Sequence, residues 1–347
     1  MMSLLALSTA PTRSTSSKPT AIRYRVIDIG TLPGHHVSQA NGINNAGQIV
    51  GVSQTETNSE GFENPKAMRQ RAVLWQNGKL IDLRTPAGFP YSYGSSINNK
   101  GEILGTFSPD LTGAHLTIVI WKNGKTQRIN LPNQKSEGLT LFNDQDDIVG
   151  NDKPGGELSS PRAFLIHQGK LVVLSPLRSG DSAGATAVAN AKSGQMPLII
   201  GISGTTPIVW RDGKPQALPT PLYGQAQAIN DAGVIVGECL SSRKGPAHPC
   251  FWRNGALHDV ASTPTENGSA MAVNNHLQIV GFFLPAKSTP LRASLWEHGH
   301  QINLNDCIPP GSGWVLTQAS GINDRGEIIG DGTHNGQERG FLLTPIR

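Results

Sequence analysis

Cysteine, charge and long apolar runs are all scarce in this 347-residue chain. Its three cysteines are too few for a disulfide framework, and none has the paired CxxC spacing that a zinc site needs. Charged residues make up 16% and form no cationic block despite a net charge of +4, so we expect no nucleic-acid binding. No apolar run approaches the roughly 20 residues that span a bilayer, so we expect no membrane insertion.

Helical and cofactor-binding patterns are also missing. No segment shows a sustained apolar period of 3.6 residues, whereas 40 glycines and 24 prolines suit short strands and turns. The Walker, Rossmann and GxSxG patterns are absent, so we expect no cofactor. Residues 1–22 hold no acid and are rich in Ser and Thr, which predicts a disordered leader and leaves open a transit-like or signal-like segment. Residues 23–347 are expected to form one domain.

One motif recurs along the whole chain, as in "INNAGQIVGVS" from Ile43 and "INDRGEIIGDG" from Ile322. Each copy starts with an apolar residue before an Asn-type turn. The seven apolar residues are Ile43, Ile97, Phe142, Val188, Ile229, Val273 and Ile322. They lie 41 to 54 residues apart, which is the spacing typical of four-stranded propeller blades.

Two further elements complete each repeat. An apolar strand ends in an aromatic residue, as in "RAVLW", and a turn such as "QNGK" then leads into a last short strand, as in "LIDL". Asn-Gly tolerates positive φ at both central positions and therefore predicts a type I′ hairpin turn. Each repeat thus supplies four antiparallel strands, which we label a to d in chain order.

The repeats predict an all-β fold, a seven-bladed β-propeller, because each blade can bury its faces only against its neighbours. Small residues such as those of "GSSIN" and "GATAV" mark strand a, where seven strands crowd the axis. The chain begins with a d-type strand, "YRVIDIG", and ends after a c-type strand, "RGFLLTP". We therefore expect the N-terminal strand to pair with the C-terminal blade and close the ring.

The pair of motifs "IN[ND]xGxIVG" and "AxLWxNGKxxDL", together with "GTLPG", resembles the HAF-type repeat proteins. The resemblance covers nearly the whole chain from Tyr24 onward. The third, fourth and sixth copies depart from it in "NDQDD", in the stretched "ANAKSGQMPLIIG" and in "NNHLQIVG". The family is bacterial and commonly predicted to be extracellular, so the resemblance implies an exported propeller and brings no catalytic residue. A cytoplasmic location stays open, because the chain shows no convincing signal peptide.

Function is expected on the face that carries the d-to-a and b-to-c connections, because these are long and differ in every blade. We predict a central funnel there that binds a glycan or another small polar ligand. The ligand-binding candidates are Tyr91, Arg178, Trp314, His115 and His248. In the alternative, an enzyme such as a lyase, hydrolase or cyclase, His36 or His35 would be the base, Tyr93 or Tyr223 the acid or oxyanion partner, and Asp181 or Glu266 an orienting carboxylate.

Three other points stay open or negative at this stage. The histidines come from separate loops without HxH or HxxxH spacing, so no metal site is predicted. Cys239 and Cys250 flank a predicted b-to-c connection and can either form a disulfide or remain buried thiols. We expect a monomer, and a protein-interaction scaffold is a further alternative that would show a broad apolar patch on the loop face.

Overall fold

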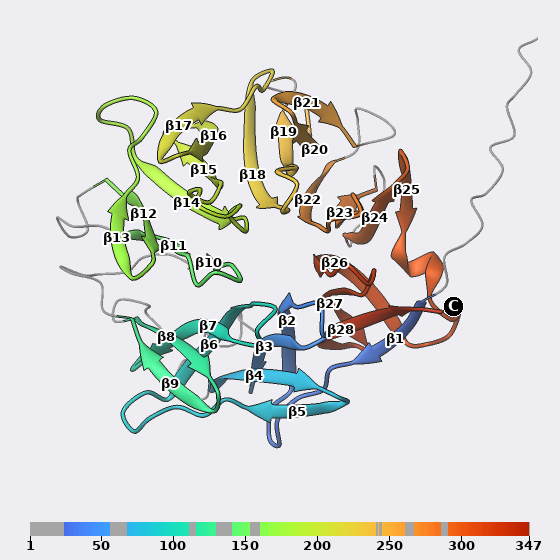
Figure 1. The fold of residues 1–347 in the computed structure, drawn as a ribbon. Coiled ribbons are helices and arrows are strands. Elements are labelled where there is room, and N and C mark those ends of the chain that lie inside the picture. The colour runs from blue at the N-terminus through green and yellow to red at the C-terminus, as the bar shows by residue number, and fades with distance from the viewer. Residues whose placement is uncertain are drawn as a thin grey trace, which may run out of the picture.

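The structure is a computed structural model that describes residues 24–55, 68–110, 116–129, 141–152, 160–240, 242, 245–260, 267–285 and 291–346. Within these ranges the chain forms 28 strands and one short 3-10 helix, and no helix is long and apolar enough to cross a membrane. The strands form seven four-stranded antiparallel blades arranged around one axis (Figure 1). One parallel pair, Gln70 with Tyr91, joins the first two blades into a continuous sheet. The predicted seven-bladed propeller is confirmed.

Blades 1 to 4 follow chain order. Blade 1 contains β2 (Val37–Ile43), β3 (Ile49–Gln54), β4 (Gln70–Gln76) and β5 (Lys79–Asp82). Blade 2 contains β6 (Tyr91–Ile97), β7 (Ile103–Ser108), β8 (Thr117–Lys122) and β9 (Lys125–Arg128). Blade 3 contains β10 (Leu141–Phe142), β11 (Ile148–Asp152), β12 (Arg162–His167) and β13 (Lys170–Val173). Blade 4 contains β14 (Ala183–Val188), β15 (Ile199–Ser203), β16 (Thr206–Arg211) and β17 (Lys214–Ala217).

Blades 5 to 7 complete the ring. Blade 5 contains β18 (Tyr223–Ile229), β19 (Ile235–Leu240), β20 (Ala247–Arg253) and β21 (Ala256–Asp259). Blade 6 contains β22 (Asn267–Val273), β23 (Ile279–Leu284), β24 (Arg292–Glu297) and β25 (His300–Asn303), and is followed by the helix η1 (Leu304–Cys307). Blade 7 contains β26 (Trp314–Ile322), β27 (Ile328–His334), β28 (Gln337–Pro345) and β1 (Tyr24–Asp28). The first strand of every blade lies nearest the axis and contacts the first strands of both neighbouring blades.

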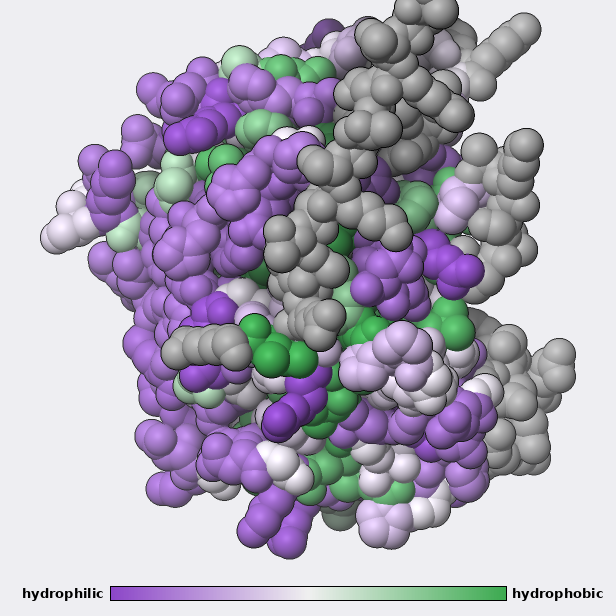
Figure 2. Space-filling model, turned by 90° about the vertical axis from the view of Figure 1, so that its right-hand side faces the viewer, coloured by the Kyte–Doolittle hydropathy of each residue, from purple (hydrophilic) through white to green (hydrophobic). Residues whose placement is uncertain are grey.

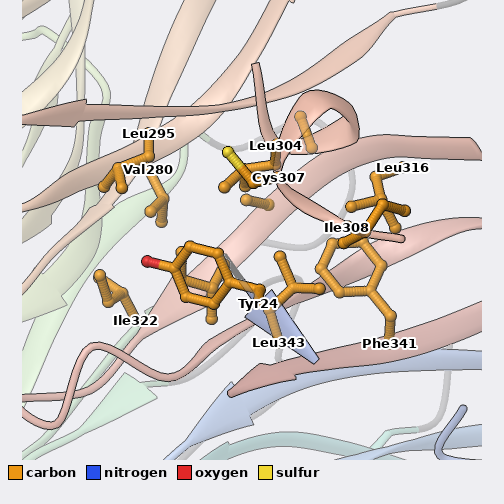
Figure 3. Packing of buried hydrophobic residues seen from close by; sticks show 13 residues of the cluster. Tyr24, Val280, Leu295, Leu304, Cys307, Ile308, Leu316, Ile322, Phe341 and Leu343 are labelled. Carbon is orange, nitrogen blue, oxygen red and sulfur yellow. The ribbon is translucent and has the colours of Figure 1, made fainter. Parts of the chain in front are cut away.

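Blade 7 is built from both ends of the chain. β1 pairs antiparallel with β28, so that Val26 lies opposite Leu343 and Asp28 opposite Phe341. The predicted closure is therefore confirmed. Tyr24, only 1% exposed, packs between blades 6 and 7 together with Leu304 of η1 (Figure 3). This cluster joins the two ends of the chain to the preceding blade, and similar apolar clusters fill the other blade interfaces.

The strand c tryptophans explain the aromatic residue of the repeat. The indole N–H of Trp121 donates to the carbonyl of Leu83 at 3.2 Å, and that of Trp210 donates to Ser175 at 2.8 Å. In both cases the acceptor lies just beyond strand d of the preceding blade. Each indole therefore buries a large apolar ring while its polar atom is satisfied by a neighbouring blade.

The turns and glycines of the repeat have the expected geometry. In the c-to-d turn of blade 1, Asn77 has φ 52° and Gly78 has φ 75°, and equivalent pairs recur in blades 2 to 6. The glycine that ends each "IVG" allows a close backbone approach. A Cβ on Gly51 would lie 1.9 Å from the carbonyl oxygen of Gln39, beside a bulge in β2. Any side chain at this position would collide with strand a.

Cys239 and Cys250 form a disulfide between β19 and β20, with a Cα–Cα distance of 5.9 Å. Both residues are buried in the interface between blades 4 and 5. The alternative of two free thiols is therefore wrong in this structure. Cys307 is buried and unpaired.

Candidate functional site

A cavity of about 490 Å³ opens above blade 1, on the face that carries the long connections. One wall comes from the connection between β1 and β2, another from the start of β4 and the end of β5, and a third from the connection to blade 2. The lining residues are Leu32, Pro33, His35, Arg69, Arg71, Asp82 and Pro90. Leucine and proline surfaces thus surround a small set of ionisable groups, which is the usual composition of a small-molecule site.

Two arginines dominate the charge of this cavity. Arg69 lies directly before β4 and Arg71 is the second residue of that strand, and both side chains line the cavity. Nη2 of Arg71 donates to both carboxylate oxygens of Asp82 at 3.1 Å. Nε of Arg71 is buried and has no hydrogen-bond partner among the described residues. The pair with Asp82 fixes the guanidinium and leaves part of its donor set unused.

His35 contributes an imidazole to the same cavity. Its backbone N–H donates to the carbonyl of Leu32 at 3.0 Å, which closes a tight turn and holds the residue over β3. Burial is the main cause of a lowered pKa of His35, and the charge of Arg71 adds to it, while the backbone of Ser53 acts in the opposite direction. The imidazole is therefore neutral at pH 7.

A second cavity, of about 400 Å³, lies along blade 7. Its lining includes Trp314, His334 and Asp28. The rings of Trp314 and His334 stack at 4.7 Å with an interplanar angle of 2°, and Nδ1 of His334 lies 3.0 Å from Asp28 Oδ2. The sequence analysis nominated Trp314 but not His334 or Asp28, because β1 reaches His334 only through the closure of the ring.

Tyr93 of β6 and Asp331 of β27 are two titratable groups whose pKa values burial raises. Burial raises the pKa of Tyr93 to about 12, with a further contribution from Asp331. Burial likewise raises the pKa of Asp331 to about 7, although its Oδ1 accepts from the backbone N–H of Ala40 at 3.1 Å. Asp331 was not among the predicted residues. Its only sequence signal is an acid directly after the glycine of "IIG".

The other nominated residues are spread over several blades. His36 is exposed, and its backbone N–H donates to Gln54. Arg178 is exposed in the connection between blades 3 and 4, where Asp181 accepts from the hydroxyl of Ser203 at 3.2 Å. His248 is buried in β20, with Nε2 3.8 Å from Asp259.

Two nominated tyrosines begin inner strands, and two other candidates cannot be placed. Tyr91 begins β6 and Tyr223 begins β18. His115 and Glu266 lie outside the described residues. In the described part of the chain, no hydrogen bond joins any two of the nominated catalytic side chains, and no three His, Cys, Asp or Glu side chains gather as a metal site would require.

The opposite face, formed by the a-to-b turns, holds an arrangement that sequence reasoning missed. The first turn position forms an inner belt of Asn44, Asn98, Asn143, Ala189, Asn230, Asn274 and Asn323. Each of its six asparagine side chains donates from Nδ2 to the backbone carbonyl at the same position of the next blade, at 2.9 to 3.4 Å. The Oδ1 of Asn44 also accepts from Ala46 and Gln48 within its own turn.

The second turn position forms an outer belt of Asn45, Asn99, Asp144, Asn190, Asp231, Asn275 and Asp324. Each residue donates its backbone N–H to Oδ1 of the next blade's residue, and the circle closes when Asp324 donates to Asn45. The belts surround an axial cavity of about 240 Å³. Asn and Asp recur in the motif because they bond both their own turn and the neighbouring blade.

Solved structures share the architecture at low sequence identity. An acylaminoacyl peptidase aligns with a TM-score of 0.58 at 10% identity, covering 89% of this chain and 51% of its own. A puromycin-hydrolysing peptidase of Mycobacterium tuberculosis aligns with a TM-score of 0.55 at 12% identity, covering 90% of this chain and 52% of its own. An oligogalacturonate lyase from Vibrio parahaemolyticus aligns with a TM-score of 0.58 at 10% identity, covering 94% of this chain and 98% of its own.

These likenesses show a common propeller fold. The chain spans about half the length of the peptidases and nearly the whole length of the lyase. No family model matches the chain, and no curated protein matches its sequence.

Proposed function

We propose that the protein is a binding module that takes a small polar ligand with a carboxylate, such as an acidic sugar, in the cavity above blade 1. The observation that supports this most is the pair Arg69 and Arg71 in the lining of this cavity, with Nε of Arg71 buried and unpartnered. A guanidinium is suited to a carboxylate because it offers paired N–H donors in one plane. The walls of Leu32, Pro33 and Pro90 would contact the apolar face of a sugar ring.

Calorimetry with two matched sugars tests the proposal. D-galacturonate and D-galactose differ only at C6, so we expect galacturonate to bind at least about tenfold more tightly, a difference of about 1.4 kcal/mol. Arg71→Gln should remove that preference. Arg69→Gln serves as the variant that leaves the Arg71–Asp82 pair intact and should reduce the preference severalfold. Arg178→Gln, an exposed arginine in the connection between blades 3 and 4, is the control and should change nothing.

Equal affinity for the two sugars, or equal weakening by the control variant, would show that the cavity does not recognise the carboxylate. Thermal unfolding of each variant, measured beside the binding, separates lost recognition from lost fold.

An enzyme using the same cavity is the second candidate, and His35 is the observation that favours it. A neutral imidazole beside a fixed Arg–Asp pair can accept a proton at pH 7, and elimination from a uronate requires such a base. An assay for unsaturated products from an oligogalacturonide tests this directly. His35→Ala should abolish turnover and leave galacturonate affinity within about twofold; absence of product from the wild-type protein leaves the binding module as the function.

An exported location is part of the proposal. The Cys239–Cys250 bridge is of a kind that forms and persists in oxidising compartments, and the resemblance to HAF-type repeat proteins points the same way. Alkylation of the denatured, unreduced protein from an exported fraction should modify one cysteine, Cys307, and all three after reduction. Modification of three cysteines without reductant would contradict the bridge.

A scaffold function has less support. Among the described residues, the exposed large apolar side chains are Ile81, Leu171, Val173, Leu222 and Ile346. Apart from Leu171 and Val173 of β13, they belong to different blades. Figure 2 shows the side of the ring on which β25 and η1 lie, where hydrophilic residues cover most of the coloured surface and apolar ones form separate spots. The described residues thus offer no broad apolar patch there.

A further inference from the structure

The a-to-b turn of blade 4 breaks the pattern of the other six. Eleven positions separate Val188 from Ile199, whereas six separate Ile43 from Ile49 and the equivalent residues of the other blades. The inner-belt position is Ala189, which has no side-chain donor. Blade 4 is therefore the only blade without a side-chain link from the inner belt to its successor among the belt positions, all of which the structure describes.

The longer turn makes shorter hydrogen bonds to blade 3 than to blade 5. Towards blade 3, the amide of Gln145 accepts from Ala191 N at 2.7 Å and donates to Ala191 O at 2.9 Å. Towards blade 5, the backbone N–H of Asn190 lies 3.4 Å from Asp231 Oδ1, the longest bond of the outer belt, whose other bonds measure 2.7 to 3.1 Å. The junction between blades 4 and 5 thus has no inner-belt side-chain bond and the longest outer-belt bond.

A cavity of about 470 Å³ occupies this junction. Its lining includes Lys192, Met196, Leu198, Arg211, Asp212 and Asp231. Met196 packs against the apolar cluster between blades 3 and 4, and Leu198 against the cluster between blades 4 and 5, and the two side chains supply the apolar part of the lining. Residues of the longer turn, from Ala189 to Leu198, thus form most of the lining of this compartment.

The charges around this apolar part of the lining have both signs. Lys192 and Arg211 are cationic, and Asp212 and Asp231 are anionic. No ion pair joins any of these four side chains to another described residue. Within the outer belt, Asp231 accepts from the backbone N–H of Asn190 at Oδ1 and from Nδ2 of Asn275 at Oδ2, so each carboxylate oxygen keeps a second lone pair for a ligand. Arg211 and Asp212 belong to the rigid β16–β17 hairpin turn, whereas Asp231 belongs to the outer belt.

We propose that this junction binds a small zwitterion with a short apolar body, that is, a free α-amino acid or a very short peptide. Asp231 would accept from the ammonium group, Arg211 would donate to the carboxylate, and the side chain would lie on Met196 and Leu198. The volume is within the range of natural small-molecule sites. The site lies on the turn face and is independent of the sugar cavity above blade 1.

L-leucine and two blocked analogues test the chemistry. Leucinamide lacks the carboxylate charge and N-acetyl-leucine lacks the ammonium charge. By titration calorimetry we expect saturable binding of leucine at one site, with each analogue weaker by at least about tenfold. Absence of saturable leucine binding, or equal binding of all three compounds, would overturn the proposal.

Matched variants locate the site. Asp231→Asn should weaken leucine binding by about tenfold. Asp324→Asn, at the same outer-belt position in the turn of blade 7, should leave it unchanged. Asn already occupies four outer-belt positions, so both variants are compatible with the fold. Arg211→Gln should weaken binding likewise, and Arg253→Gln, at the equivalent turn of blade 5, is its control. Equal effects of a variant and its control would contradict the assignment.

Discussion

The turn face and the long-loop face of the ring differ in what their connections contact. On the turn face, the same two Asn-type positions bond the next blade in nearly every repeat and form the inner and outer belts. On the long-loop face, each connection has its own sequence, and the residues around the cavity above blade 1 come from blade-specific segments. Equivalent contacts all round the circle stabilise the ring, while non-equivalent ones create local sites. The junction after blade 4 shows that the turn face also forms a site where its repeat is broken.

The largest expected effect in this comparison comes from the inner belt. Asn44→Ala should lower the free energy of unfolding by about 2 to 4 kcal/mol, because it leaves two turn N–H groups without partners and removes the bond from Asn44 to the carbonyl of Asn98, which keeps only Gly101 N as donor. Chemical denaturation measures this. Asn77→Gly, an exposed c-to-d turn residue of the same blade with φ 52°, is the control and should change stability by less than about 0.5 kcal/mol. Equal losses would mean that the belts do not stabilise the ring.

A pH-dependent effect is expected from the interior, between the two faces. The pKa of Asp331 is raised to about 7 from its ordinary value of 3.8, so its ionised form is disfavoured in the folded state. The contribution of Asp331 to the free energy of unfolding should therefore be largest at about pH 4 and below. It should decrease by roughly 2 to 4 kcal/mol as the pH rises through 7.

Asp331→Asn should flatten this decline when denaturation is followed from pH 4 to 8. The fold accommodates the change, because Asn151 occupies the equivalent position of blade 3 and bonds Ala185 N at 2.8 Å. A decline of the same size in the variant would assign it to other groups, such as Glu238, whose pKa burial also raises.

The smallest effect is expected on the long-loop face away from the cavities. Arg178→Ala removes an exposed side chain with no described hydrogen bond or ion pair of its own, so unfolding free energy should change by less than about 0.5 kcal/mol. The same denaturation assay applies. A loss comparable to that of the belt variant would show that the two faces contribute alike to stability.

The strands and turns of each blade could be predicted because they depend on residues that are close together in the repeat motif. Asn77 and Gly78 adopt the predicted left-handed turn, and "IVG" glycines lie where any Cβ would collide. Site residues were harder to predict. His35 and Trp314, both predicted for one central funnel, line two separate cavities at blades 1 and 7, whereas Arg71, Asp82 and Asp28 were not predicted because they look like ordinary ends of strands in the sequence.

The sequence by itself determined the number of blades, their strand order and the closing pair, because each repeat carries its own turn chemistry and apolar alternation. Only the tertiary structure decided which side chains meet across blades. The belts, the Asp28–His334 contact and the cavity beside Asp231 join residues of different repeats. Such contacts depend on how neighbouring blades are positioned around the axis, and no local sequence pattern determines that relative position.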